Sequence, residues 1–240
     1  MLRETVSQVL DTDPDFEWRG GSVTRIENLS DIVFALALGM LVSASQPPVT
    51  ADQLTNFLWN IVPVSAAFAI MIMIWNAHFT YFRRYGLADA KAVFLNAVLL
   101  LIIMFIAYPL RFIFDSLFAY VLGLFGDGQR SNALGLNEGD AAHVMSIYAL
   151  GYAVVYLILH RLYAHALKKR EMLSLSEKEV ILTRQTLGRF LVNILLSVPV
   201  FFLARYTELG PWAGFLWCCA WPSAFAIKRL SDHRIKKAMA

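Results

Sequence analysis

The feature that most constrains this chain is a series of long apolar runs that carry almost no charge and that alternate with short polar segments. Of its 240 residues, 58% are hydrophobic and only 16% are charged. A soluble domain carries about 25% charged residues. A helix that crosses a bilayer needs about 20 consecutive apolar residues, and several of these runs approach that length. The pattern therefore predicts an all-α membrane protein with repeated transmembrane helices.

Six transmembrane helices are predicted from the apolar runs, and several of them begin with a helix-capping pattern. A Ser or Thr followed three residues later by Glu or Gln is typical of a helix start, and it occurs at Thr24–Glu27, Thr50–Gln53 and Ser176–Glu179. The predicted spans cover residues 25–45, 54–80, 90–111, 142–163, 186–204 and 211–228. They form one membrane domain over residues 24–229, between an N-terminal tail of residues 1–23 and a basic C-terminal tail of residues 230–240.

The positions of the basic residues predict the orientation of the chain. Of its 21 Lys and Arg residues, all but Arg111, Arg130 and Arg205 fall on one side of the six spans. An excess of Lys and Arg marks the cytoplasmic side. Both termini are therefore expected in the cytoplasm of a multi-pass protein of the cell (plasma) membrane, with the lipid bilayer as a partner. The basic loop between the fourth and fifth spans is predicted to set this topology, and contact with anionic lipid is an alternative role.

The same distribution argues against other classes of protein. The net charge is +3, but the basic residues flank apolar segments, so no nucleic acid partner is expected. The sequence contains no nucleophile–base pattern, phosphate loop or metal motif, which argues against an enzyme and against a cofactor. Cys218 and Cys219 are adjacent within an apolar stretch, and we interpret them as two packed thiols.

Histidines near the span ends leave a haem-bearing redox carrier as an alternative. His78, His143, His160 and His165 lie there, and membrane histidines can bind haem in pairs. His143 and His160, however, are separated by about 25 Å along one helix, and only the second span offers a partner. We therefore disfavour haem binding, and a purified protein without Soret absorbance would exclude it.

The first predicted span is unusual because it is only partly apolar. Its strictly apolar part runs from Ile32 to Val42, which is shorter than the ~20 residues needed to cross the bilayer. The preceding turns carry the charges of Arg25, Glu27 and Asp31. Charges in lipid are costly and normally face protein or water. The first helix is therefore expected to be central, with its charged half shielded by neighbours or by a water-filled vestibule.

Helical geometry at about 100° per residue divides this helix into faces. Ile32, Leu36, Met40 and Ser43 share one stripe, which fits either a pore lining or ordinary helix packing. Asp31 lies about 140° round the helix from Leu36, so it points sideways into the protein if the stripe lines a pore. There it needs partners, because a buried unpaired carboxylate is very unfavourable.

The segment Arg25-x-x-x-Leu29-Ser30-Asp31 resembles the Arg-x-x-x-Phe-Ser-Asp signature of the endosomal and lysosomal potassium channel family, transmembrane protein 175, and its bacterial homologues. Residues of the family's second and third helices have counterparts at Trp75, His78, Phe82, Asp89, Asn96 and Pro109. The resemblance is strong over residues 24–110, and the last three spans match mainly in count and length.

The resemblance implies a potassium-permeable, leak-type cation channel that assembles as a homotetramer, with the first helices around a central pore. Hydrophobic side chains of the first helix form the constriction in this family, at positions that fall here on Leu36, Met40 and Ser43, with Ile32 on the same stripe. No re-entrant selectivity filter is expected, and the sequence contains no Thr-Val-Gly-Tyr-Gly motif. The resemblance also implies a polar network that holds the pore helix, made by Arg25, Ser30, Asp31, His78 and Asn96.

Two departures from the family pattern concern ion selectivity. Gly39 stands where several members have a threonine whose hydroxyl contributes to potassium selectivity, and Ser43 replaces a hydrophobic residue at the outer constriction. A non-selective or proton-permeable cation channel is therefore an alternative, with His78 as a possible proton sensor or, more simply, a buried packing residue. A secondary transporter and a non-conducting structural role are further alternatives, although no inverted repeat is apparent.

Overall fold

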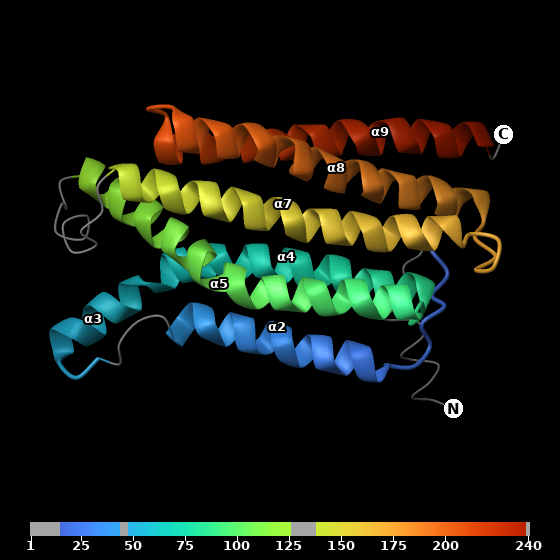
Figure 1. Cartoon of the computed structure of the whole chain (residues 1–240), viewed down its shortest axis with the longest axis horizontal. Coiled ribbons are helices and arrows are strands. Elements are labelled where there is room, and N and C mark those ends of the chain that lie inside the picture. Colours follow the sequence, from blue (N-terminus) through green and yellow to red (C-terminus); the bar gives the residue numbers. More distant parts are fainter. Residues whose placement is uncertain (1–14, 44–47, 126–137, 239–240) are drawn as a thin grey trace.

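A computed structural model describes residues 15–43, 48–125 and 138–238, and it builds the chain from helices. The elements are α2 (Arg25–Ser43), α3 (Ala51–Trp59), α4 (Ile61–Tyr85), α5 (Ala90–Leu124), α7 (Glu138–Lys168), α8 (Glu177–Tyr206), the 3-10 helix η1 (Gly210–Cys219) and α9 (Ala220–Ala238). Figure 1 shows the long helices running side by side, with α2 along one edge of the bundle and α9 along the opposite edge. The helices α4, α5, α7 and α8 lie between them, so the core forms in the middle of the bundle.

Within the described ranges, five helical segments are long and apolar enough to cross a membrane. They run over Arg25–Ser43, Ala51–Tyr85, Ala90–Gly123, Gly139–Lys168 and Glu177–Tyr206. These segments agree with the first five predicted spans, but most continue past the predicted ends. Apolar windows locate the part of a helix that crosses the hydrocarbon core, whereas the hydrogen-bonded helix continues into the polar region beyond it.

The sixth predicted span, residues 211–228, is not one apolar helix. The segment is divided at Ala220, where the 3-10 turns of η1 give way to α9. The 3-10 helix is only 10 residues long, and α9 carries charged side chains from Lys228 onward. Neither part by itself combines the length and the apolar composition of a span.

The predicted capping patterns are present at two helix starts and partly present at a third. Thr24 Oγ1 accepts from the Glu27 amide at 3.3 Å, and Glu27 Oε1 accepts from the Thr24 amide at 2.9 Å. Ser176 and Glu179 form the same capping box before α8. Thr50 caps α3, but the Gln53 side chain accepts from the Val49 amide instead, so that start is a simple cap. These local hydrogen bonds satisfy amides that have no partner within their own helix.

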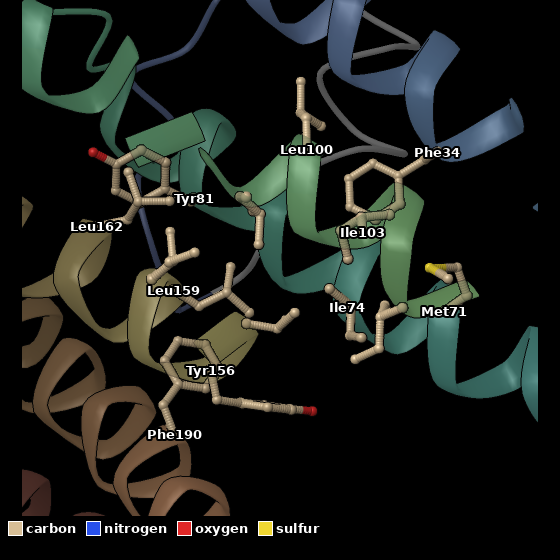
Figure 2. Close-up of a cluster of buried hydrophobic side chains, with 14 of the residues drawn as sticks. Phe34, Met71, Ile74, Tyr81, Leu100, Ile103, Tyr156, Leu159, Leu162 and Phe190 are labelled. Atoms are coloured by element: carbon tan, nitrogen blue, oxygen red, sulfur yellow. The ribbon is translucent and has the colours of Figure 1, made fainter. Parts of the chain in front are cut away.

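Aromatic and branched side chains fill the core between the central helices (Figure 2). Figure 2 shows Phe34 of α2 near Ile103 of α5, with Leu159 of α7 and Phe190 of α8 further along the same cluster. Tyr163 packs its ring 5.2 Å from that of Phe190 and donates its hydroxyl to the Ala77 carbonyl at 2.8 Å. A buried tyrosine hydroxyl needs such a partner, so this bond fixes α7 against α4.

A polar cluster joins the start of α5 to the end of α7. The Asp89 carboxylate caps α5 by accepting from the Ala92 amide at 2.9 Å, and it also accepts from Lys169 Nζ at 2.6 Å and from His165 Nε2 at 2.8 Å. The hydrogen bond from Lys169 is the largest reason why the pKa of Asp89 lies well below its usual value. The ionised carboxylate therefore ties two helices together through one cap.

The segment before α2 is fixed on the ends of α4 and α8. Arg19 forms a two-point contact with the Glu179 carboxylate, at 2.8 and 3.0 Å, and donates to the Leu173 carbonyl at 2.7 Å. The hydrogen bond to Glu179 raises the pKa of Arg19 above its usual value. The Gly20 amide donates to the Arg83 carbonyl at 3.0 Å, which brings two backbones into direct contact. The entry of the chain into α2 is therefore set by two other helices.

The backbone contact at Gly20 leaves no room for a side chain. A Cβ there would lie 2.4 Å from the Phe82 carbonyl oxygen, so Gly20→Ala should lower stability by about 1–3 kcal/mol. Gly21→Ala adds the same methyl group where nothing lies within 4 Å, and it should change stability by less than about 0.5 kcal/mol. Thermal unfolding of the detergent-solubilised protein would compare the two midpoints. Equal midpoints for the two variants would contradict the close contact.

Candidate functional site

One face of α2 packs against the bundle, and the described residues of the chain leave the other face uncovered. The helix lies against α4 and α5 at the edge of the bundle (Figure 1). Its buried residues recur every three or four positions, at Glu27, Ser30, Phe34, Ala37 and Leu41. This spacing puts them on one side of an α-helix. Within the described part of a single chain α2 is therefore peripheral, whereas the sequence predicted a central position for it.

The opposite side of α2, which we call the open face, is charged at its start and apolar further along. It consists of Arg25, Leu29, Ile32, Leu36, Gly39 and Ser43, all exposed in the single chain. Ile32 and Leu36 keep 59% and 56% of their surface exposed. Met40 is half-buried against the core, because it lies about 40° round the helix from Leu36 toward the packed side. Three residues of the predicted stripe thus share the open face, and Met40 lies at its border.

A chain of buried hydrogen bonds attaches the packed face of α2 to its neighbours. The Ser30 hydroxyl donates to the Ile26 carbonyl at 2.7 Å and accepts from Asn96 Nδ2 at 2.9 Å. Asn96 Oδ1 lies 2.7 Å from His78 Nε2. Because Oδ1 can only accept, His78 donates through Nε2. Three of the predicted network residues, one from each of α2, α4 and α5, are therefore linked within the core.

The His78 ring also packs between two aromatic side chains. Its centroid lies 5.6 Å from that of Phe34 and 4.9 Å from that of Phe82. The side chain is only 2% exposed. This environment and the bond to Asn96 describe a packed histidine with a satisfied ring nitrogen.

The other two predicted network residues, Asp31 and Arg25, lie apart from this chain of hydrogen bonds. Asp31 Oδ1 accepts from the indole nitrogen of Trp75 at 2.9 Å, so its partner is a residue outside the predicted network. Arg25 is exposed, and its side chain makes no hydrogen bond or ion pair within the part of the chain that the structure describes. The reason is geometric, because Arg25 begins the open face while the network lies on the packed face.

Trp75 is the functional candidate that sequence reasoning missed. Trp75 is not part of the predicted polar network, but its indole N–H donates to Asp31 and its ring stacks on Phe79 at 5.4 Å. Two signals were present in the sequence. Trp75 lies three residues before His78 on one helix, so both side chains face similar directions, and a partly buried indole N–H usually finds an acceptor.

Comparison with known proteins identifies relatives for nearly the whole chain. A family model described as the endosomal/lysosomal potassium channel TMEM175 matches residues 25–107. This range includes α2, α4 and the first half of α5, the helices that carry the open face and the buried hydrogen bonds. A protein from Marivirga tractuosa named a potassium channel is 32% identical over 220 residues, which cover 89% of this chain and 86% of that protein.

A solved structure of a potassium channel shares the helical arrangement. The crystal structure of the potassium channel MtTMEM175, in a threonine-to-alanine variant bound to a nanobody–MBP fusion, superposes with a TM-score of 0.80 at 28% identity. The match covers 92% of this chain and 99% of that one. The structure of a lysosomal potassium-selective TMEM175 homologue from Chamaesiphon minutus gives a TM-score of 0.49 at 22% identity, over 85% of this chain and 96% of that one.

A double-mutant cycle tests the contact between Asp31 and Trp75. Asp31→Ala and Trp75→Phe each remove the same hydrogen bond, so each should destabilise the protein by about 1–2 kcal/mol and the double variant should cost less than the sum. Thermal unfolding in detergent and the elution volume of the purified assembly are the measurements. The control pairs Asp31→Ala with Trp221→Phe, because Trp221 is 84% exposed on α9, and this pair should be additive. Additivity in both cycles would argue against the contact.

Proposed function

The chain belongs to the TMEM175 family, since its relative from Marivirga tractuosa is 32% identical over most of both chains, and we propose that it is a potassium-permeable, leak-type cation channel. The family description, that relative and the structure at a TM-score of 0.80 all carry the name potassium channel, which is the name of an ion channel and not of an enzyme. Together with its apolar helices, membership makes the chain a multi-pass membrane protein. We place it in the cell membrane with both termini in the cytoplasm, as the Lys and Arg distribution supports.

The observation that carries the proposal is the open face of α2. The charge of Arg25 at the start of this face and the exposed Asp31 beside the face would be costly in lipid. The apolar side chains of Ile32 and Leu36, in contrast, are not stabilised by contact with bulk water. A homotetramer with four copies of α2 around a common axis satisfies both demands. The polar end then borders a water-filled vestibule, and the apolar middle is shielded from bulk water by the other copies.

The constriction is proposed at Leu36. Four leucine side chains around an axis form a narrow apolar ring that expels water and blocks ions until it widens. Ile32, Gly39 and Ser43 lie on the same open face, and Met40 contributes from its border. The ring offers no oxygen ligands, so K⁺ should bind weakly as a permeant ion, without a re-entrant filter.

A non-selective or proton-permeable cation pore is the second candidate, and Gly39 is the observation that favours it. The family resemblance puts a selectivity-contributing threonine at this position, and glycine has no side-chain oxygen. The open face at Gly39 has space for a side chain, since a Cβ there would meet none of the described residues within 4 Å. A secondary transporter is a further outcome of the test below.

Recording from the purified protein in planar bilayers, with potassium on one side and sodium on the other, tests the proposal. A current that reverses toward the potassium equilibrium potential is the expected result. Reversal near zero would favour the non-selective pore. A protein that is well folded and reconstituted but passes no current would overturn the channel proposal and favour a transporter or a structural role.

Two variants of Gly39, tested in the same recording, distinguish the effect of a side-chain hydroxyl from the effect of side-chain size. Thr and Val have nearly the same shape, but only Thr carries a hydroxyl. If this position sets selectivity, Gly39→Thr should move the reversal potential toward the potassium potential, and Gly39→Val should not. Equal reversal potentials for the two variants would remove Gly39 from the selectivity argument.

Polar substitution at the constriction should increase conductance. Leu36→Asn replaces an apolar ring with hydrated amides, so the pore should wet more easily and pass at least several times more current. Leu101→Asn is a matched control, because Leu101 is 57% exposed on α5, outside the open face. Unchanged current in Leu36→Asn would refute the gate assignment.

A further inference from the structure

A buried arginine of α5 contacts the C-terminal end of α2 on its packed face. Arg111 is only 3% exposed, and its Nη1 donates to the Leu41 carbonyl at 2.7 Å. Its Nε donates to Asp115 Oδ2 at 2.6 Å, one turn further along α5. The sequence had placed Arg111 at the external end of the third span, but α5 continues to Leu124. Arg111 therefore lies inside the helical bundle.

The bond to Leu41 joins a buried guanidinium to a backbone carbonyl near the C-terminal end of the described part of α2. Leu41 lies two residues before Ser43, the last described residue of α2. A cation at this end also interacts favourably with the negative end of the helix dipole. Asp115 balances the charge, which allows the guanidinium to be buried. The Leu41 carbonyl and the Asp115 carboxylate together therefore hold the Arg111 side chain in one position.

The direction of this contact matters because Leu41 is fully buried on the packed face of α2. Arg111 thus holds the helix without bordering the open face. The N-terminal half of α2 is held by the neutral hydrogen bonds of Ser30 and Asn96, and the C-terminal end by this charge-assisted bond. Between the two attachments lie Leu36 and Gly39.

We infer that Arg111 is a positioning residue for ion permeation: by binding the Leu41 carbonyl it fixes how far the outer half of α2 stands from the channel axis. The inference rests on the proposed function, since it requires α2 to line the ion path. Arg111 sets the width of the path at Gly39 and Ser43 through the backbone, and it does not contact the ion.

Two substitutions test this role in the full-length protein reconstituted in proteoliposomes. Arg111→Gln removes the charge, and Arg111→Lys keeps the charge but cannot make both directed bonds with a planar fork. Arg205→Gln is the matched control, because it removes an arginine from the end of α8 whose side chain lies over the Tyr206 ring and not on α2. If Arg111→Gln fails to assemble, Arg111→Lys carries the comparison.

The readouts report on the ion path and not only on stability. Ser43→Cys is introduced with Cys218→Ser and Cys219→Ser, and its rate of modification by a small cationic thiol reagent is measured with the potassium–sodium reversal potential. Arg111→Gln should change the modification rate by about tenfold, the order expected from losing a charge-assisted hydrogen bond, and should shift the reversal potential. Arg111→Lys should recover part of both effects, and Arg205→Gln should match the parent.

The outcomes distinguish the inference from the proposed function. A parent that conducts, with Arg111 variants that keep its reversal potential and modification rate, would overturn the positioning role alone. Changes of the same size in Arg205→Gln would do the same, because they would show a general effect of external charge. A parent that passes no cation current would overturn the proposed function and the inference with it.

Discussion

A helix that is charged in its first turns and apolar beyond them cannot satisfy either lipid or water along its whole length, and this constraint organises the molecule. Polar groups within a bilayer must find partners in the protein or face water. The helix α2 meets the requirement on one side only, where Ser30 binds Asn96 and Glu27 closes a capping box with Thr24. The other side, with Ile32 and Leu36, has no partner in the described chain, and this exposed side is the basis of the proposed assembly.

The remaining helices serve mainly to fix this one. The helices α4 and α5 hold its packed face through apolar contacts around Phe34 and through the buried hydrogen bonds of His78 and Asn96. Arg19, in the segment before α2, binds Glu179 at the start of α8, so this segment is held against α8. The C-terminal end is held by Arg111. A helix held at both ends and on one face is well suited to line a path of defined width, the role proposed for it.

Much of this arrangement could be predicted from the sequence, because it follows from local periodicity. The capping boxes, the first five spans and the spacing that leaves Leu36 and Ile32 on one face all depend on residues within a few turns of each other. The errors lie where a contact joins residues far apart in the chain. Asp31 binds Trp75 instead of a member of the predicted polar network, and Arg111 lies within the bundle instead of at the external end of a span. The sequence also did not show how the last predicted span is built, since its apolar residues are divided between a short 3-10 helix and the start of α9.

The sequence by itself determined that the chain is a bundle of membrane helices whose first member is too polar for lipid, because hydrophobic length and charge placement are properties of consecutive residues. Only the tertiary structure decided which face of α2 is packed and which polar groups hold it. Helical periodicity shows that two faces exist, but it does not show which neighbour covers either one. That depends on how α4 and α5 pack, where Asn96 meets Ser30 and Arg111 meets the Leu41 carbonyl across 66 and 70 positions of the chain.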